Sequence, residues 1–289
     1  MSDRIEVLKT YKTYIGGKFP RTESGRHYKV YDGNDEVLAN ACQCSRKDFR
    51  DAVVAARDAS SSWSGRSAYN RGQILYRIAE MLESRKAQFI DELETIGYSS
   101  KEAKKEVNTS IDRLIYFAGW SDKYQQVFGS INPVASSHFN FSIPDPTGVV
   151  SIIAAEEHPL LGLVSLIAPV IVGGNTCVVL ASEKYPLSAI SFAEVLHSSD
   201  VPGGVVNILT GYREELHGHM TSHMDVNAVL YTDSSLKEQF GKQMDENASL
   251  NVKRMVYKPV EDWFSNEIEN PYLITDFQEI KTTWHPIGL

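Results

Sequence analysis

The chain has 289 residues, of which 42% are hydrophobic and 23% are charged, and its net charge is −8. This composition is typical of a folded chain with one large or two modest domains, and the acidic balance without a basic stripe excludes a nucleic-acid-binding surface. No apolar run reaches the ~20 residues that a membrane span requires, so no membrane segment is expected.

The cysteine content and the first residues indicate the compartment. Only Cys42, Cys44 and Cys177 are present, which is an odd, sparse set typical of a reducing cytosol. The Cys42-x-Cys44 spacing is too tight for an ordinary zinc knuckle and has no second pair, so no metal site is expected. The opening residues MSDRIEVLKTYK contain no apolar core of a secretory signal. We therefore expect a cytoplasmic protein.

The first part of the chain predicts a hairpin and three helices. A Gly-Gly turn within Tyr14–Phe19, followed by Tyr28–Tyr31, predicts a β-hairpin. Ser45–Asp48 has the pattern of a capping box that opens a helix. Apolar residues at helical spacing predict a second helix around residues 70–89 and a third over about residues 101–128. These segments are interpreted as packing helices with solvated charged faces.

A short alternating segment separates these helices from the core of the chain. Phe139–Ile143 alternates in polarity, and Pro144 and Pro146 follow it. Because one face of such a strand is buried and the other is exposed, we expect it to lie outside the main sheet.

The core of the chain alternates strand and helix patterns. The apolar run Val149–Ala154 predicts a buried strand, residues 160–172 a helix, and Cys177–Leu180 a second buried strand. The alternation then continues, with helices predicted near residues 190–196, 214–220 and 236–241 and strands at 205–209, 228–232 and 251–257. Continuous apolar strands joined by helices predict an α/β fold with an open, Rossmann-like parallel sheet.

The same residues carry a family resemblance. In order along the chain stand GVVSIIAAEEHPLL from Gly148, GNTCVVLASE from Gly174, VPGGVVN from Val201 and TDS from Thr232. These blocks resemble the cofactor-binding domain of the aldehyde dehydrogenase superfamily, where they have the wording GVVGIIAPWNYPLL, GNTVVVKPSE, LPPGVVN and FTGS. The segment YIGGKF, from Tyr14, resembles the start of the family's fold.

The resemblance implies a division of the chain. Residues 1–257 resemble the family's N-terminal and cofactor-binding domain, with an oligomerisation-arm strand at about residues 137–146. Residues 258–271 read as a linker in place of the family's catalytic domain, because neither an ELGGK block nor the nucleophilic cysteine in its GQ-x-C setting occurs there. Residues 272–289 resemble the family's C-terminal oligomerisation strand. The linker-like composition extends over about residues 245–270.

The resemblance implies that the catalytic groups are missing. None of the three cysteines matches the nucleophile, and Cys177 is predicted to be buried in a strand, where a thiol is inert. Glu157 stands where the family's PWN block has the asparagine that stabilises the oxyanion, and a carboxylate there repels a developing negative charge. The alternative role of Glu156 or Glu157 as a general base lacks a nearby nucleophile.

The cofactor positions are only partly retained. Glu183 and Ser234 match the family residues that meet the adenosine ribose and the pyrophosphate, whereas Leu180 replaces the ribose-binding lysine. Asp233 replaces a glycine, and two unit charges ~4 Å apart in a partly buried site repel by about 4 kcal/mol, which corresponds to roughly a thousandfold in affinity. We expect no NAD(P) binding or only weak binding. Asp233 can serve as a helix N-cap instead.

A histidine cluster and the arm segments complete the analysis. His217, His219 and His223 do not share one helix face and are interpreted as solvated residues rather than metal ligands. The segments 139–143 and 280–287 are alternating stretches with little local partner, and such strands can complete a sheet across subunits.

These observations favour a non-catalytic aldehyde dehydrogenase-like subunit, a pseudoenzyme, that assembles with an active full-length paralogue as an oligomer through its β-strand arms. Three alternatives stay open. One is a nucleotide-sensing module, and another is an NAD(P)-dependent aldehyde oxidoreductase that is active only as a composite with its partner. The third is a homo-oligomeric relic that has no partner.

Overall fold

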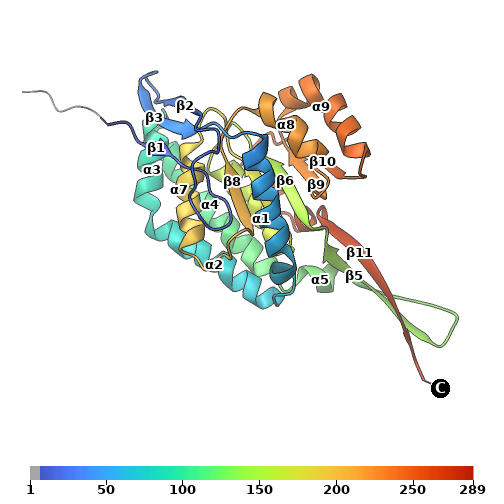
Figure 1. The fold of residues 1–289 in the computed structure, drawn as a ribbon. Coiled ribbons are helices and arrows are strands. Elements are labelled where there is room, and N and C mark those ends of the chain that lie inside the picture. Colours follow the sequence, from blue (N-terminus) through green and yellow to red (C-terminus); the bar gives the residue numbers. More distant parts are fainter. Residues whose placement is uncertain (1–6, 289) are drawn as a thin grey trace, which may run out of the picture.

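Five parallel strands form the central sheet of the protein, in a computed structural model that describes residues 7–288 (Figure 1). The strand order is β10-β9-β6-β7-β8. Every residue of β6 and β7 is buried, which explains why their sequences are continuously apolar. The five strands are β6 (Val149–Ile153), β7 (Thr176–Leu180), β8 (Val206–Leu209), β9 (Ala228–Tyr231) and β10 (Arg254–Tyr257).

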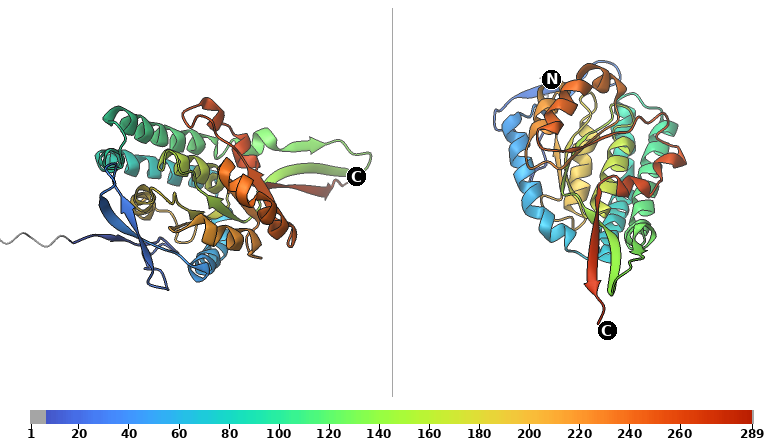
Figure 2. Two further views of the ribbon diagram at one scale, coloured as in Figure 1. Left: turned by 90° about the horizontal axis from the view of Figure 1, so that it is seen from above. Right: turned by 90° about the vertical axis from the view of Figure 1, so that its right-hand side faces the viewer.

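Helices cover both faces of this sheet (Figure 2). One apolar core lies on the face of the sheet that α6 covers, and every residue of α6 is buried there. Side chains from α2, α3, α4 and α7 belong to the same core. A second core lies on the other face, under α1, α8 and α9. The helices are α1 (Arg46–Ser64), α2 (Ala68–Ser84), α3 (Lys86–Thr95), α4 (Ser100–Trp120), α5 (Tyr124–Phe128), α6 (Leu161–Val172), α7 (Leu187–His197), α8 (Arg213–Ser222), α9 (Ser234–Ser249) and α10 (Tyr272–Thr275). The predicted α/β fold with a Rossmann-like parallel sheet is confirmed. Among residues 7–288, no helix is both long enough and apolar enough to cross a membrane.

The predicted N-terminal hairpin is wrong. β2 (His27–Tyr31) pairs antiparallel with β3 (Val37–Cys42), and β1 (Thr10–Tyr11) pairs parallel with β3. Gly16 and Gly17 do make a tight turn, with φ of 60° and 76°, but this turn joins only Ile15 to Lys18. Tyr14 then exchanges backbone hydrogen bonds with Ile208 of β8, so this segment is tied to the central sheet instead.

Two of the predicted helices are each divided. The apolar pattern over residues 70–89 belongs to α2 and α3, which are separated at Arg85, and the pattern over residues 101–128 belongs to α4 and α5, which are separated by residues 121–123. Side chains on both sides of each break share one core, so the spacing of apolar residues does not reveal the break.

A third sheet projects from the body as an arm (Figures 1 and 2). It contains β4 (Ser130–Asn132), β5 (His138–Pro146) and β11 (Gln278–Pro286) in the order β11-β5-β4. The expectation that 139–143 lies outside the main sheet is confirmed. The expectation that the two arm segments lack a local partner is wrong, because β5 and β11 pair antiparallel along nine residues, from Gln278 with Pro146 to Pro286 with His138.

The segment between β10 and β11 is packed on the domain. Residues 245–249, whose composition predicts a linker-like stretch, belong to α9 instead. Within 258–277 the side chains of Trp263, Ile274 and Phe277 are 3%, 0% and 2% exposed, and they join the core formed by α4 and α6. The segment contains a 3-10 turn (Asn266–Ile268) and α10, so Tyr272–Thr275 is helical rather than part of the C-terminal strand.

Candidate functional site

The candidate site lies at the carboxyl ends of the central strands. The chain leaves β6 towards β7 on one side and later returns to place β9 on the other side of β6. Such a switch point is where open α/β sheets bind ligands. Here an open cleft of about 790 Å³ is lined by Glu156, which follows β6, by Glu183, which follows β7, and by Asp233, which follows β9.

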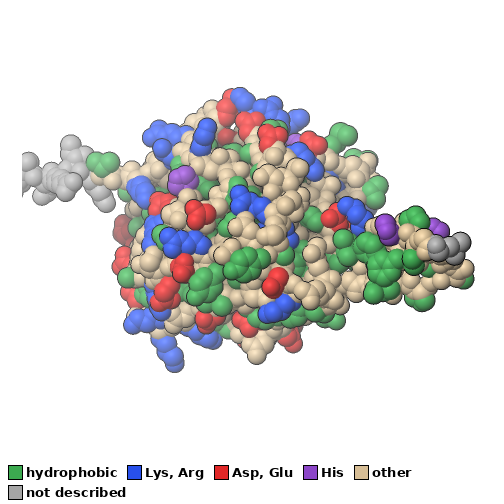
Figure 3. Space-filling view, turned by 90° about the horizontal axis from the view of Figure 1, so that it is seen from below, with side chains coloured by type: hydrophobic (Ala, Val, Ile, Leu, Met, Phe, Trp, Pro, Cys, Tyr) green, Lys and Arg blue, Asp and Glu red, His purple; other side chains and the backbone are tan. Residues whose placement is uncertain are grey.

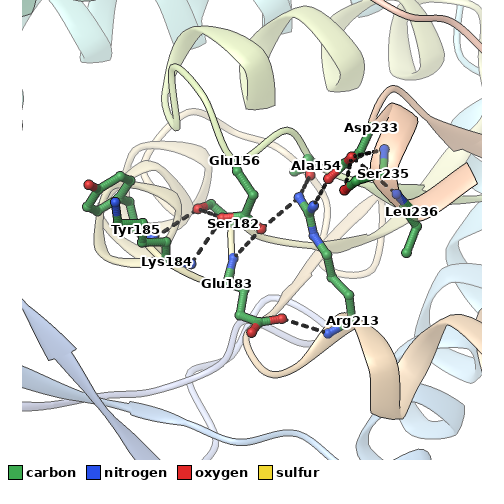
Figure 4. A network of polar contacts seen from close by, with 10 residues as sticks. All are labelled: Ala154, Glu156, Ser182, Glu183, Lys184, Tyr185, Arg213, Asp233, Ser235 and Leu236. Carbon is green, nitrogen blue, oxygen red and sulfur yellow. Dashed lines mark hydrogen bonds and ion pairs between the residues drawn. The ribbon is translucent and has the colours of Figure 1, made fainter. Parts of the chain in front are cut away.

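Arg213, the first residue of α8, spans this crevice (Figure 4). Its guanidinium forms ion pairs with Glu156, at 2.7 Å between Nη2 and Oε1, and with Asp233. It also donates a hydrogen bond to the carbonyl oxygen of Ala154, at the end of β6. Only 9% of the Arg213 side chain is exposed. One arginine thus joins the loops that follow β6 and β9.

The Glu156 carboxylate is held by the loop that follows β7. It accepts hydrogen bonds from the Ser182 hydroxyl at 2.6 Å and from the backbone N–H groups of Glu183 and Lys184 at 2.9 and 3.0 Å. With the Arg213 ion pair, both of its oxygens have partners within the protein.

Glu183 is also occupied within the chain. Its Oε2 accepts a hydrogen bond from the backbone N–H of Arg213 at 3.0 Å. A carboxylate is favourable at this position because the first turn of a helix presents unpaired N–H groups and a positive dipole end. Leu180, at the position of the family's lysine, lies in β7 and is fully buried in the core beneath the site.

Asp233 caps α9. Its Oδ1 accepts hydrogen bonds from the backbone N–H groups of Ser235 and Leu236 at 2.8 and 3.2 Å, which confirms the expected N-cap. Burial opposes ionisation of this carboxyl, but the Ser235 and Leu236 hydrogen bonds and the Arg213 charge outweigh it and lower its pKa. Ser234 is exposed in the first turn of the helix.

The charges at the crevice are unfavourable for a pyrophosphate. The Arg213 guanidinium pairs with two carboxylates, those of Glu156 and Asp233, and a third carboxylate, that of Glu183, lies at the backbone N–H of Arg213, so the local charge is negative. The guanidinium thus already spans the ends of β6 and β9, and the Glu183 carboxylate is bound to α8. Sequence reasoning found Glu183, Ser234 and Asp233 but missed Arg213. The one feature of the sequence that could have indicated Arg213 is its position directly after β8, because the other site residues were also expected at the carboxyl ends of the strands.

The position equated with the oxyanion asparagine lies beside this network. Glu157 is exposed, and the residue that follows it, His158, has φ of 51°, which is uncommon for a non-glycine residue. His158 Nδ1 lies 2.9 Å from Oε2 of Glu106, a carboxylate that is 0% exposed. Oε1 of Glu106 accepts hydrogen bonds from the N–H groups of Leu160 and Leu161, where α6 begins.

The contact between His158 and Glu106 gives a pH-dependent prediction. The hydrogen bond to Glu106 raises the pKa of His158 above its ordinary 6.5 although burial opposes this. A group with a raised folded-state pKa stabilises the fold fully below the unfolded pKa, and this stabilisation is lost as pH rises through the folded pKa. We therefore compare the free energy of unfolding of the wild type with that of His158→Gln. The difference is expected to be largest near pH ~5.5, which is below the ordinary histidine pKa, and to shrink towards pH ~8.5. Urea denaturation at several pH values measures it, and a pH-independent difference contradicts the ion pair.

The cysteines are not placed for nucleophilic chemistry. Cys42, Cys44 and Cys177 are all free and buried. Burial raises the pKa of the Cys44 and Cys177 thiols, so neither is a ready thiolate.

The histidines of α8 differ from the expectation in one respect. His217 is 5% exposed rather than solvated, and its ring stacks on Phe240 with centroids 4.1 Å apart while Nδ1 lies 3.0 Å from the Arg213 carbonyl oxygen. Within residues 7–288, no three His, Cys, Asp or Glu side chains are grouped so that they can hold a metal ion.

Comparison with known proteins identifies relatives of the whole α/β body. Residues 20–258 match the aldehyde dehydrogenase family. The chain is 32% identical to aldehyde dehydrogenase, cytosolic 1, of Elephantulus edwardii over 259 residues, which cover 87% of this chain and 50% of that protein. It is 29% identical over 263 residues to the putative aldehyde dehydrogenase DhaS of Bacillus subtilis, covering 88% and 52%.

A solved structure shows the same relation. Betaine aldehyde dehydrogenase from Staphylococcus aureus, in complex with NAD+, superposes with a TM-score of 0.80 at 25% identity, covering 86% of this chain and 49% of that one. The chain thus spans about half the length of the relatives that it matches.

Proposed function

Because this chain belongs to the aldehyde dehydrogenase family, we propose that it is a non-catalytic member that assembles, through its arm sheet, with an active full-length aldehyde dehydrogenase paralogue. In this role it contributes structure or regulation to a hetero-oligomer rather than turning over substrate itself. The observation that carries the proposal is the arm, because it projects from the body and exposes large apolar side chains (Figure 1).

The polar side of the arm holds its strands together. Asn132 Nδ2 donates hydrogen bonds to Asn140 Oδ1 at 2.6 Å and to the Ser142 hydroxyl at 2.9 Å, and the Ser142 and Thr282 hydroxyls are 2.8 Å apart. Asn140 is only 3% exposed. These hydrogen bonds stabilise the arm sheet without any contribution from its apolar side chains.

The opposite side of the arm exposes apolar residues of β4 and β5 (Figure 3). Strand alternation places Ile131, Phe139, Phe141 and Ile143 on this side, with Ile131 directly opposite Phe141. Ile131, Phe139 and Ile143 are 71%, 41% and 37% exposed. An apolar patch of this kind marks a protein–protein interface. In addition, β11 pairs only with β5, so its outer edge presents N–H and C=O groups to which a partner strand can add.

The candidate site supports the non-catalytic part of the proposal. At the crevice the Arg213 guanidinium pairs with the Glu156 and Asp233 carboxylates, the described cysteines are buried, and the resemblance places Glu157 where the family has its oxyanion asparagine. The nucleotide-sensing alternative has no specific observation in its favour, because Glu183 is bound to α8.

The composite-site alternative has no specific observation in its favour either. Glu157 is exposed in an open cleft that His158 and Phe264 also line, and this cleft brings no described cysteine near Glu157.

The arm is testable by co-expression with a full-length paralogue from the same organism. We expect the tagged chain to co-elute with the paralogue as one complex in native mass spectrometry. The double variant Ile131→Glu/Phe139→Glu is expected to lose this complex, since it places charges on the exposed apolar side, while keeping its circular dichroism spectrum.

The matched control is Tyr69→Glu, which charges a 66% exposed aromatic residue on α2, away from the arm. It is expected to leave the complex intact. Recovery of the tagged wild-type chain only as itself, with no paralogue bound, contradicts the proposal; equal loss of binding in both variants contradicts the assignment to the arm.

A further inference from the structure

A second cavity lies beneath the segment that joins β10 to β11. Its volume is about 270 Å³, and its walls come from α6, from the ends of β9 and β10, and from residues 258–277. The residues that line it are a different set from those that line the crevice around Arg213. The cavity therefore requires its own explanation.

Most of the cavity wall is apolar and aromatic. Trp263 and Phe277 come from the covering segment, Leu166 and Pro169 from α6, and Leu230 from β9. Trp263, Phe277 and Leu230 are 3%, 2% and 3% exposed, so these walls belong to the rigid core. Flat aromatic walls favour a flat ring as a guest because offset and edge-to-face contacts become available. An apolar cavity of about 150 Å³ is already large enough to take up benzene.

The polar part of the cavity consists of an ion pair, one further carboxylate and a hydroxyl. Lys258 and Asp276 both line it and form an ion pair with each other, and Glu267 adds an exposed carboxylate. Thr232, which is 8% exposed, adds a hydroxyl that can donate or accept a hydrogen bond. Since the lysine charge is offset by Asp276 and Glu267 leaves the lining negative, an anionic guest loses its hydration without gaining a free counter-charge.

We propose that this cavity binds a small neutral molecule that consists of one planar ring and one hydroxyl or amide group. The ring fits between the Trp263, Phe277 and Leu166 walls, and the polar group meets Thr232 and the Lys258–Asp276 pair. This inference goes beyond the proposed function and does not rest on it, because the cavity is formed within one chain and shares no lining residue with the crevice or with the strands of the arm.

Calorimetric titration of the full chain with benzyl alcohol tests the proposal. We expect one saturable site per chain with a dissociation constant of about 1 mM or tighter, as expected for so small a ligand. Benzoate, which shares the ring but carries a negative charge, is expected to bind at least about tenfold more weakly. Absence of saturable binding by benzyl alcohol, or equal binding of benzyl alcohol and benzoate, overturns the proposal.

Two neighbouring residues of α10 provide a matched pair of variants. Leu273 lines the cavity, whereas Tyr272 is 62% exposed. Leu273→Trp is expected to fill the cavity and to weaken benzyl alcohol binding at least about tenfold, while Tyr272→Trp leaves it unchanged. Leu166→Phe, which fills the cavity from α6, decides the matter if Leu273→Trp does not fold. Unchanged binding in the folded filling variant overturns the proposal.

Discussion

Replacement of Trp263 by alanine is expected to lower the free energy of unfolding by about 3–5 kcal/mol, the range for removing a large aromatic side chain from a packed core. The indole is 3% exposed and belongs to the same core as α4 and α6. Its loss leaves a void between residues 258–277 and the core. This segment has no other tryptophan that could fill the void, so the surrounding side chains can relax only partly.

The backbone at Trp263 adds to this effect. Its carbonyl oxygen accepts a hydrogen bond from Arg113 Nη2 at 3.2 Å, and the Arg113 guanidinium, which is 1% exposed, also lies 3.5 Å from the Glu269 carboxylate. A covering segment that loosens after the substitution leaves this arginine short of partners, and an unpaired buried charge is costly.

Urea denaturation at fixed protein concentration measures the change. Trp284→Ala serves as the control because Trp284 is 57% exposed on the arm, and it is expected to change stability by no more than about 1 kcal/mol. If the Trp263 and Trp284 variants lose the same stability, the segment 258–277 is not part of the core.

Replacement of Arg213 by alanine is expected to cost about 2–4 kcal/mol of unfolding free energy. The substitution leaves Glu156 and Asp233 facing one another across the crevice without their shared cation. The value is set below that of a fully buried pair because the carboxylates keep 31% and 22% of their side-chain exposure and retain hydrogen bonds to neighbouring loops.

Two further substitutions separate charge from geometry. Arg213→Lys keeps the charge but cannot reach two carboxylates and a carbonyl with one planar fork, so its loss of stability is expected to be intermediate. Arg77→Ala removes an arginine that is 49% exposed and paired with Glu80, and it is expected to cost less than about 0.5 kcal/mol. An Arg213→Ala cost no greater than that of Arg77→Ala would falsify the structural role of the network.

The central sheet could be predicted from the sequence because each of its strands is marked by a local pattern of residues. A buried strand such as Val149–Ile153 is a short, mostly apolar run, and turn residues separate it from the next helix. The N-cap at Asp233 was accessible for the same reason, since a cap involves only the first turn of its own helix.

The parts that the sequence did not predict depend on long-range contacts. Nothing local distinguishes the guanidinium of Arg213 from an ordinary solvated charge on α8, because its partners lie 57 positions earlier at Glu156 and 20 positions later at Asp233 (213 − 156 and 233 − 213). Trp263 stands in the run EDWFSNE, whose polar composition hides one fully packed side chain. The mutual pairing of β5 and β11 was missed because strand alternation identifies a strand but not its neighbour.

The pairing of β5 with β11 also affects how the protein is made. At translation rates of about 5–20 residues per second, β5 emerges on the order of 10 s before the strand that completes it. During that interval the nascent chain carries Phe139 and Phe141 on β5, while the strand that pairs with β5, β11, has not yet left the ribosome. Among the described elements the arm sheet is therefore completed last, and before β11 appears the apolar side chains of β5 are open to aggregation and to binding by chaperones.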